Sequence, residues 1–556
     1  MDIKKAIGSL NIDFKSIQDE NLRATIILLL NAVEQFSKEI DELRKKNQEL
    51  TDEINRLKGE QGKPNIRPQK DKKDKDISSE SERKVDEEEN KEPKNPKPKK
   101  EDIKIDRVER CEVNKNELPP DAEFKGYEPV IIQDIKITTD NIKFERAAYY
   151  SASLSRTYLG PLPPGYKGQF GPGVKSLVLD LYQDGGMTEP ALKRFFETHG
   201  IYISSGMISK IITDNIEPFH QEKTDIVDAG LDVTDYHHLD DTAARVNGNN
   251  HHTHILCNPL FTAYFTLATR DRLAAIEVLS NGNLLFCINE KTYTLMLELG
   301  LSEKRLNQLK ELNLTSTLMT KSEIDEKIKL LFPNTHRHQT SQKVIREAAA
   351  IIAYQQYCGK THILLTDGAL QFQLITKHHG LCWVHEGRHY KKLNPVLMIH
   401  QELLKSFCKA FWEYYRRLLA FKKSPTEKES KDLFTTFDEL FSKQTGYQDL
   451  DNRIASTLAK KEKLLLVLRF PHIPLHNNSA ELGARVQARK RDISLQTKNI
   501  KGTKSKDTLM TVIETAKKLG VNTFKYIYDR LSGKHEMPSL ADLIRQRSYH
   551  HCCALG

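Results

Sequence analysis

A seven-residue hydrophobic repeat over residues 22–57 is the strongest constraint in this chain of 556 residues. Its positions alternate at spacings of four and three: Leu22, Ile26, Leu29, Val33, Phe36, Ile40, Leu43, Asn47, Leu50, Ile54 and Leu57. With Leu22 at heptad position d, β-branched residues fill most a positions and leucine most d positions. This pattern favours two parallel strands, and a single buried asparagine at a fixes their register. We predict a dimerising coiled coil over residues 1–58, and hence a homodimer or higher oligomer; a helix packed on its own chain is the alternative.

Length and composition narrow the class of protein further. A chain of this length exceeds one hydrophobic core, so several domains are expected. No apolar run approaches the roughly 20 residues that span a bilayer, and the first residues do not resemble a signal peptide. The eight cysteines form no CxxC pair, which favours reduced thiols. We expect a cytoplasmic protein without membrane contact, whose net charge of +9 suits an anionic partner.

The composition changes sharply after the repeat. Residues 59–102 are dominated by charged residues, proline and serine, and cannot bury enough apolar surface to offset the entropy of ordering. We predict a disordered linker there. Residues 103–173 follow as a small β-rich module, because EPVIIQDIKITTDNIKF alternates apolar and polar residues. PLPPGYKGQFGPG at 161–173 is expected to end this module as a hinge.

Residues 174–225 are predicted to hold three short helices. Thr188 can cap the second of them, and Ser204 or Ser205 the third. Short helices joined through a glycine-containing turn resemble a helix-turn-helix, whose last helix enters the DNA major groove. Ser205 and Lys210 would then contact DNA. A helical subdomain that only packs on its neighbour is the alternative.

Residues 226–500 mix strand and helix patterns. A β-meander is expected in HHLDDTAARVNGNNHHTHILCNPLFTAYFTLAT, with turns at NGNN and NPLF. Two further strands are expected in THILLTDGA and HGLCWVH. Periodic apolar positions predict helical insertions at about 300–358 and 395–470. Residues 501–556 are expected to form a C-terminal helical tail.

Acidic residues lie at the ends of several of these elements. Asp240 and Asp241 lie in the first strand, Asp367 closes ILLTD, and Glu481 starts a helix. An acid directly after a buried strand faces the cleft beyond the strand ends. Three convergent carboxylates suit two Mg²⁺ ions, which take oxygen ligands and bridge a scissile phosphate. Taken singly, these acids also have ordinary explanations. A strand-terminal Asp is usually a turn residue, and an acid in the first turn of a helix usually interacts with the helix dipole.

The helix that begins near Glu481 becomes strongly basic. Asn477 and Asn478 precede the acid and are expected to shape the turn and cap the helix. Four cations follow it: Arg485, Arg489, Lys490 and Arg491. On a helix the first two of these share a face with Glu481. We expect the four cations to bind DNA phosphates.

The acidic blocks read HHLDDTAARVNG, LLTDGALQF (followed by LCWVHEGRHYKKL) and PLHNNSAELGARVQARKRDIS, and KKLGVNTFKYIYDRL follows near the end. In order, context and separation they resemble the blocks and closing helices of insertion sequence 66-type transposases, over about residues 165–535. NN-x-x-E leading into basic residues is the most specific feature. The resemblance implies an α/β fold: an RNase H-like mixed-sheet catalytic core with helical insertions, preceded by the coiled coil and the β-rich module.

The resemblance also assigns roles to single residues. It makes three acids the catalytic and metal-binding residues: Asp240, Asp367 and Glu481. The family commonly reads Asp-Glu-Thr where this chain reads Asp240-Asp241-Thr242, so Asp240 is taken as the ligand, Asp241 as its support, and the reverse as the alternative. Cys382 and His385 would brace the strand or contact DNA. No zinc is expected, because a zinc site would need two more ligands.

The function implied is that of a DNA transposase. It would cleave element ends and join the 3′-hydroxyl to target DNA by two-metal in-line transesterification, with Mg²⁺ or, in its place, Mn²⁺. Terminal repeats, target DNA and small accessory proteins of the same element would be its partners, in a bacterial, nucleoid-associated location. Two alternatives stay open: a catalytically silent DNA-binding relative, and an RNase H-like nuclease or resolvase that hydrolyses without joining.

Overall fold

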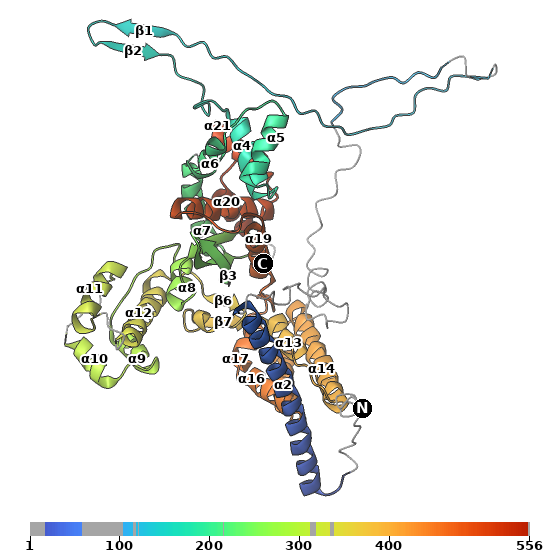
Figure 1. Cartoon of the computed structure of the whole chain (residues 1–556), viewed down its shortest axis with the longest axis vertical. Helices are drawn as coiled ribbons and strands as arrows, with labels where there is room; N and C mark the ends of the chain where they lie inside the picture. Colours follow the sequence, from blue (N-terminus) through green and yellow to red (C-terminus); the bar gives the residue numbers. More distant parts are fainter. Residues whose placement is uncertain are drawn as a thin grey trace.

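The structure, a computed structural model, describes residues 17–57, 104–114, 118–119, 122–214, 216–311, 318–333 and 338–553. Figure 1 shows a sheet near the middle of the molecule, a helical group above it, and two separate helical insertions beside and below it. The predicted linker at 59–102 lies outside the described residues. None of the helices in the described ranges combines the length and hydropathy needed to cross a bilayer.

A mixed five-stranded sheet forms the centre. Its strands are β3 (Tyr236–Val246), β4 (Asn249–Cys257), β5 (Thr262–Leu267), β6 (Ile363–Thr366) and β7 (His378–Leu381), in the order β5-β4-β3-β6-β7. The first three are antiparallel, whereas β6 runs parallel to β3 and β7 parallel to β6. Asn247 and Gly248 both have positive φ, the conformation of a tight hairpin turn. The predicted meander and the strand before Asp367 are therefore confirmed.

The prediction for HGLCWVH was wrong in its second half. The strand ends at Leu381, and α13 (Trp383–Lys391) begins at Trp383. The reason is a cap: the Cys382 sulfur accepts a hydrogen bond from the backbone N–H of His385, 3.3 Å away. Cys382 and His385 therefore belong to a helix N-terminus rather than to a strand.

Helix α20 (Ile500–Lys518) closes the free edge of the sheet. Side chains of Thr511 and Asp507 accept hydrogen bonds from the backbone N–H groups of Tyr264 and Thr266 of β5, at 3.1 and 2.6 Å. An edge strand would otherwise present unpaired backbone groups. The predicted C-terminal helices are present as α20, α21 (Thr523–Ser532) and α22 (Leu540–Cys553).

The helical group above the sheet has the three predicted short helices. They are α4 (Pro172–Gln183), α5 (Glu189–Thr198) and α6 (Ser205–Asp214), followed by α7 (Glu217–Asp232). Thr188 caps α5, since its hydroxyl accepts from the N–H of Ala191. Ser204 caps α6 through the N–H of Met207, at 3.2 Å. These hydrophobic faces pack into the same core as the sheet.

The two insertions are separate groups of helices. The first comprises α8 (Arg272–Leu279), α9 (Glu290–Glu298), α10 (Glu303–Lys310), α11 (Lys321–Leu331) and α12 (Gln339–Ala353). The second comprises α13, α14 (Met398–Lys423), α15 (Glu427–Phe441), α16 (Gln448–Leu458), α17 (Lys461–Leu464) and α18 (Leu466–Arg469). This second insertion has its own hydrophobic cluster around Trp383, whose indole N–H donates to the Leu464 carbonyl at 2.8 Å.

The N-terminal part differs from expectation in the β-rich module. The structure has one hairpin there, β1 (Ala148–Ser151) with β2 (Arg156–Leu159), and the described residues from 104 to 147 contain no strand. Val130, Ile132 and Ile135 are exposed, so the alternating pattern has no layer to pack against. Helix α2 (Glu20–Leu57) is present over the heptad repeat, and its pairing with a second copy stays a prediction.

Candidate active site

The sheet sets two acids side by side. His238 of β3 lies opposite Leu365 of the parallel strand β6. Continuing that register by two residues places Asp240 beside Asp367, directly after the end of β6. The Asp367 carboxylate accepts a hydrogen bond from the N–H of Ala369 at 3.0 Å, which fixes the turn that follows.

Helix α19 (Asn478–Ser494) brings the third acid, Glu481, in its first turn. The helix packs across β3 and β4. Gly483 permits this close approach: a Cβ there would lie 2.7 Å from the Cγ2 of Ile255, and the Tyr264 hydroxyl already donates to the Gly483 carbonyl at 3.2 Å. A larger residue would lift the helix, and Glu481 with it, from the sheet.

Asp240 carries the electrostatic signature of crowded carboxylates. Burial, followed by the charges of Asp367 and Glu481, raises the pKa of Asp240 to about 8, although the N–H of Asp241 hydrogen-bonds to it and opposes the shift. The neighbouring Asp241 projects to the opposite face of the strand. There it accepts from the Gln371 side chain at 2.8 Å. The geometry therefore favours Asp240 over Asp241 as the partner of the other two acids.

Arg388 of α13 holds the third acid. Its Nη2 donates to the Glu481 Oε2 at 3.0 Å, and its Nη1 lies 3.5 Å from Oε1. Both side chains are largely buried. A fork-shaped guanidinium on a carboxylate is a strong and geometrically specific pair. Arg388 thereby balances the charge of Glu481, whereas Asp240 and Asp367 form no ion pair within the described residues.

Residues 326–505 match the family model described as Transposase IS66 family. These residues are an IS66-family transposase domain. They contain Asp367, Arg388 and Glu481, and Asp240 precedes them. One curated relative, "Uncharacterized protein y4jO" of Sinorhizobium fredii (strain NBRC 101917 / NGR234), is 29% identical over 315 residues, which cover 54% of this chain and 94% of that protein. The transposase domain thus includes two of the three acids and the whole second insertion.

A buried polar network fixes the loop before α19 in the transposase domain. Asn477 accepts from the ring of His238 at 2.9 Å and donates to the Leu239 carbonyl at 3.2 Å. Its N–H donates to the Cys382 sulfur at 3.2 Å. Burial lowers the pKa of His238 to about 3, so the ring is neutral. The side chain of Asn477 therefore holds β3, α13 and α19 together. It does not cap α19, so the prediction of a cap by Asn477 was wrong.

Within the second insertion, α16 and the residues just after it anchor α13, and with it Arg388. The carboxylate of Glu386 is buried and pairs with Arg453 and, at 3.1 Å, with Lys460; it also accepts from the Thr457 hydroxyl at 2.7 Å. Burial alone would raise the pKa of Glu386, but these two cations and the hydroxyl lower it below its ordinary value. The charged Glu386 ties one face of α13 to α16 and its C-terminal flank.

The basic residues of α19 divide into two groups. Arg485 and Arg489 are exposed and can reach a phosphate backbone. The prediction that Lys490 binds DNA was wrong: its side chain is buried, donates to the Tyr182 carbonyl and lies over the Tyr182 ring. Burial, followed by the charge of Lys506, lowers the pKa of Lys490 to about 7. Arg491 is partly engaged, since its Nη1 donates to the Ala243 carbonyl at 2.8 Å.

The predicted DNA contacts of α6 lie on its open side. Ser205 and Lys210 are exposed, whereas Ile208, Ile211 and Ile212 are buried in the core shared with the sheet. The arrangement is compatible with a recognition helix. It fits equally well with a helix whose inner face only packs, so both interpretations given for the segment remain.

The three acids offer only oxygen donors, the chemistry that Mg²⁺ prefers. In the described part of the chain, no three acid, histidine or cysteine side chains already converge closely enough to hold an ion. Glu481 is turned to Arg388, and Asp240 is raised in pKa by its neighbours. Asp240, Asp367 and Glu481 fit a divalent cation once Glu481 leaves Arg388 and Asp240 loses its proton.

Several residues of this site were not singled out from the sequence. Arg388 lies in the quoted stretch LCWVHEGRHYKKL, seven residues after the end of β7, among other basic residues that do not distinguish it. His238 and Gln371 lie in the quoted stretches HHLDDTAARVNG and LLTDGALQF, but nothing in their local sequence distinguishes them. Their roles depend on partners more than 90 residues away in the chain, at Glu481, Asn477 and Asp241.

Proposed function

We propose that this protein is a DNA transposase whose active site consists of Asp240, Asp367 and Glu481. It cleaves the ends of its element and joins the free 3′-hydroxyl to target DNA. The observation that carries the proposal is the strand register that sets Asp240 beside Asp367, with Glu481 in the first turn of α19, which packs across β3. The IS66 transposase domain supports the same class of reaction. The strand order β5-β4-β3-β6-β7, with the acids on β3 and after β6, agrees with the expected RNase H-like core.

Different residues of the chain would bind the metal, position the third acid and bind DNA. Asp240, Asp367 and Glu481 would hold Mg²⁺. Bound Mg²⁺ would supply the Lewis acidity that activates a water or a 3′-hydroxyl and stabilises the leaving oxygen. Asp240 gives up its proton to become a ligand, and Arg388 keeps Glu481 in place when no cation is bound. Arg485 and Arg489, exposed on the same helix as Glu481, bind the flanking phosphates of element or target DNA.

Two alternative functions would give different reaction products. A catalytically silent relative would bind ends without cleaving them, and a nuclease or resolvase would cut without joining. The presence of all three acids argues against the silent form. Joining, rather than cutting, separates a transposase from a nuclease.

The test uses labelled duplex DNA that carries the sequences flanking the gene, incubated with the full-length protein and Mg²⁺ or Mn²⁺. Nicking and joining at the element tips are expected for the wild type and should be lost in Glu481→Gln. Asp492→Asn, an exposed acid further along α19, is the matched control and should retain both. Joining by Glu481→Gln at the wild-type rate would exclude Glu481 from the site. End binding without cleavage by the wild type, with and without the element's companion proteins, would identify a silent DNA-binder.

A further inference from the structure

Helix α2 uses one of its faces to bind the transposase domain. Asn31, Glu34 and Lys38 bind that domain, and Ile27 lies beside Gly446. We call these four residues, with the buried Leu30, the clasp face. In the heptad numbering that puts Leu22 at d, these residues occupy, in chain order, positions b, e, f, b and f. Positions b and f lie on the side of the helix away from a and d, whereas Leu30 at e borders them.

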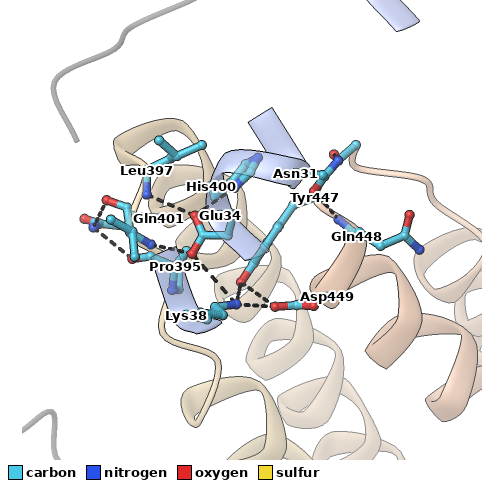
Figure 2. Close-up of polar contacts among 12 residues, drawn as sticks. Asn31, Glu34, Lys38, Pro395, Leu397, His400, Gln401, Tyr447, Gln448 and Asp449 are labelled. Atoms are coloured by element: carbon cyan, nitrogen blue, oxygen red, sulfur yellow. Dashed lines mark hydrogen bonds and ion pairs between the residues drawn. The ribbon is translucent and has the colours of Figure 1, made fainter. Parts of the chain in front are cut away.

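The clasp face makes specific polar contacts with the second insertion (Figure 2). Glu34 is 3% exposed and accepts from the backbone N–H groups of Val396 and Leu397, at 2.7 and 3.2 Å, and from His400 at 3.3 Å. Burial alone would raise the pKa of Glu34, but the bonds from His400 and the two N–H groups, with Lys38, lower it. A charged carboxylate thus lies at the N-terminus of α14, where the helix dipole favours it.

The neighbouring clasp residues bind α16 and the turn before it. Asn31 donates to the Gly446 carbonyl at 2.9 Å and accepts from the N–H of Gln448 at 2.9 Å. Lys38 pairs with Asp449. These contacts are the kind that fix one orientation, because every group has a directional partner.

Most a and d positions of the same helix are exposed. The exposed fractions at the d positions are 52% for Leu22, 56% for Leu29, 61% for Phe36 and 63% for Leu43 and Leu50. At the a positions, Ile40 and Ile54 are about half exposed, and Ile26 and Val33 are partly covered. We call these a and d residues, from Leu22 to Ile54, the heptad stripe. In Figure 1 the second half of α2 extends past the helices of the insertion.

We propose that a second copy of this chain covers the heptad stripe in a parallel pair while both clasp faces stay bound to their insertions. Each α2 would then have two partners: the other α2 on one side and a transposase domain on the other. An apolar stripe of this length at heptad spacing needs a helix partner to leave water. The clasp buries Leu30 at one e position and partly covers Ile26 and Val33, but it leaves the other a and d positions of the heptad stripe exposed.

Charge and register favour a parallel copy as the occupant. In a parallel pair, a residue at g faces the residue at e five positions further along the partner. Glu39 at g would therefore face Arg44 of the partner helix, and the symmetric pair would form on the other side. Asn47 would face its own equivalent at an a position, the arrangement in which a buried asparagine hydrogen-bonds across the interface. The antiparallel arrangement would lose both matches.

In such a pair, a continuous chain of contacts would connect each α2 to the candidate active site. The clasp holds α14 and α16, the insertion holds α13 through Glu386, and α13 carries Arg388 to Glu481. The inference concerns assembly and does not rest on the proposed activity.

The heptad stripe is tested by measuring the mass of the full-length protein in solution by light scattering. The wild type should have twice the chain mass of 63.9 kDa, and Leu43→Glu with Leu50→Glu should have the mass of one chain. Leu28→Glu is the matched control, since Leu28 lies at position c and is 69% exposed; it should keep the doubled mass. A single-chain wild type at micromolar concentration, or a doubled mass for the Leu43/Leu50 variant, would overturn the proposal.

The clasp is tested by hydrogen exchange at the N–H groups of Val396 and Leu397. Exchange should be equally slow in the wild type and in the Leu43/Leu50 variant, which also shows that this variant is folded. Glu34→Gln should speed exchange at least tenfold without changing the mass. Protection seen only in the single-chain variant would show that clasp and pairing exclude each other. Loss of the dimer in Glu34→Gln would show that pairing depends on the clasp. Either result would overturn the proposal that the two faces are occupied at the same time and independently.

The orientation is tested with Asn47→Cys under mild oxidation. A parallel pair places the two introduced thiols together, so a covalent dimer should form that the wild type does not form under the same conditions. A covalent dimer no more abundant than in the wild type would contradict the parallel arrangement.

Discussion

Arg388 and Glu481 form an ion pair between α13 and α19, with Nη2 and Oε2 3.0 Å apart and side chains 21% and 15% exposed. The two residues are 93 positions apart in the chain. The pair joins the second insertion to the helix that carries the third acid. It also gives Glu481 a partner that a bound cation would have to replace.

Replacing Arg388 by Gln should destabilise the protein most in the absence of divalent cations. Glu481 would then add an uncompensated charge beside Asp240 and Asp367, at a cost of about 1–3 kcal/mol in the free energy of unfolding. Mg²⁺ should restore part of that loss, because the cation neutralises the same carboxylate. Thermal unfolding in EDTA and in Mg²⁺ measures the effect, with Arg485→Gln, an exposed arginine of α19, as the control. An equal loss in both conditions would mean that no cation competes with Arg388.

Asp240→Asn should stabilise the metal-free protein, and more so at higher pH. In the folded state the pKa of Asp240 is about 8, above the ordinary aspartate value of 3.8, so the folded protein keeps a proton that the unfolded chain loses. The free energy of unfolding of the wild type therefore falls as pH rises from about 4 to about 8. The variant lacks this term and should exceed the wild type by roughly 1–4 kcal/mol at pH 8.

Denaturant unfolding in EDTA at pH 5 and pH 8 checks this prediction. The difference between Asp240→Asn and the wild type should be larger at pH 8, and Asp492→Asn should show no such growth. A variant that is less stable than the wild type at pH 8 would contradict the crowding of the three acids.

Arg489 and Lys490 are neighbours in sequence and should differ in their effect on DNA binding. Arg489→Ala should weaken binding several-fold and reduce the slope of log affinity against log salt by about one, because one phosphate contact is lost. Lys490→Met should leave that slope unchanged, since the Lys490 side chain is buried on Tyr182. Fluorescence anisotropy over a salt series measures both. A reduced slope for Lys490→Met would show that Lys490 leaves its buried position on DNA.

Gly483→Ala should lower the free energy of unfolding by about 1–3 kcal/mol, the usual range for overpacking. The added methyl would lie 2.7 Å from Ile255, within the contact that seats α19 on the sheet. The matched control is Gly206→Ala in α6, where a Cβ meets nothing within 4 Å. This control should be neutral or slightly stabilising, because alanine is the better helix former. Equal effects of the two substitutions would show that α19 has room at Gly483.

Local patterns were enough to predict most of the elements. The strands that became β3 to β5 were predicted from alternation and from the turns NGNN and NPLF, and β6 from its apolar run ending at Asp367, because these patterns are local in the sequence. The caps at Thr188 and Ser204 were readable for the same reason: their hydrogen bonds join residues three apart. The heptad repeat gave α2, since helix periodicity is visible without a partner. The alternation over residues 128–144 also predicted strands, but these residues are exposed, and the described part of the chain has no second layer packed against them.

The sequence by itself thus determined where most of the strands and helices run, and through its resemblance it singled out three acids as candidates for one site. Only the tertiary structure decided that Asp240 rather than Asp241 faces the other two acids, that Arg388 holds Glu481, and that Lys490 is buried. The clasp face of α2 was also invisible in the sequence, because Glu34 looks like any surface acid until it meets α14. The physical reason is the same in each case: the partners are 90 to 370 residues apart, and only the packed sheet and insertions bring them into contact.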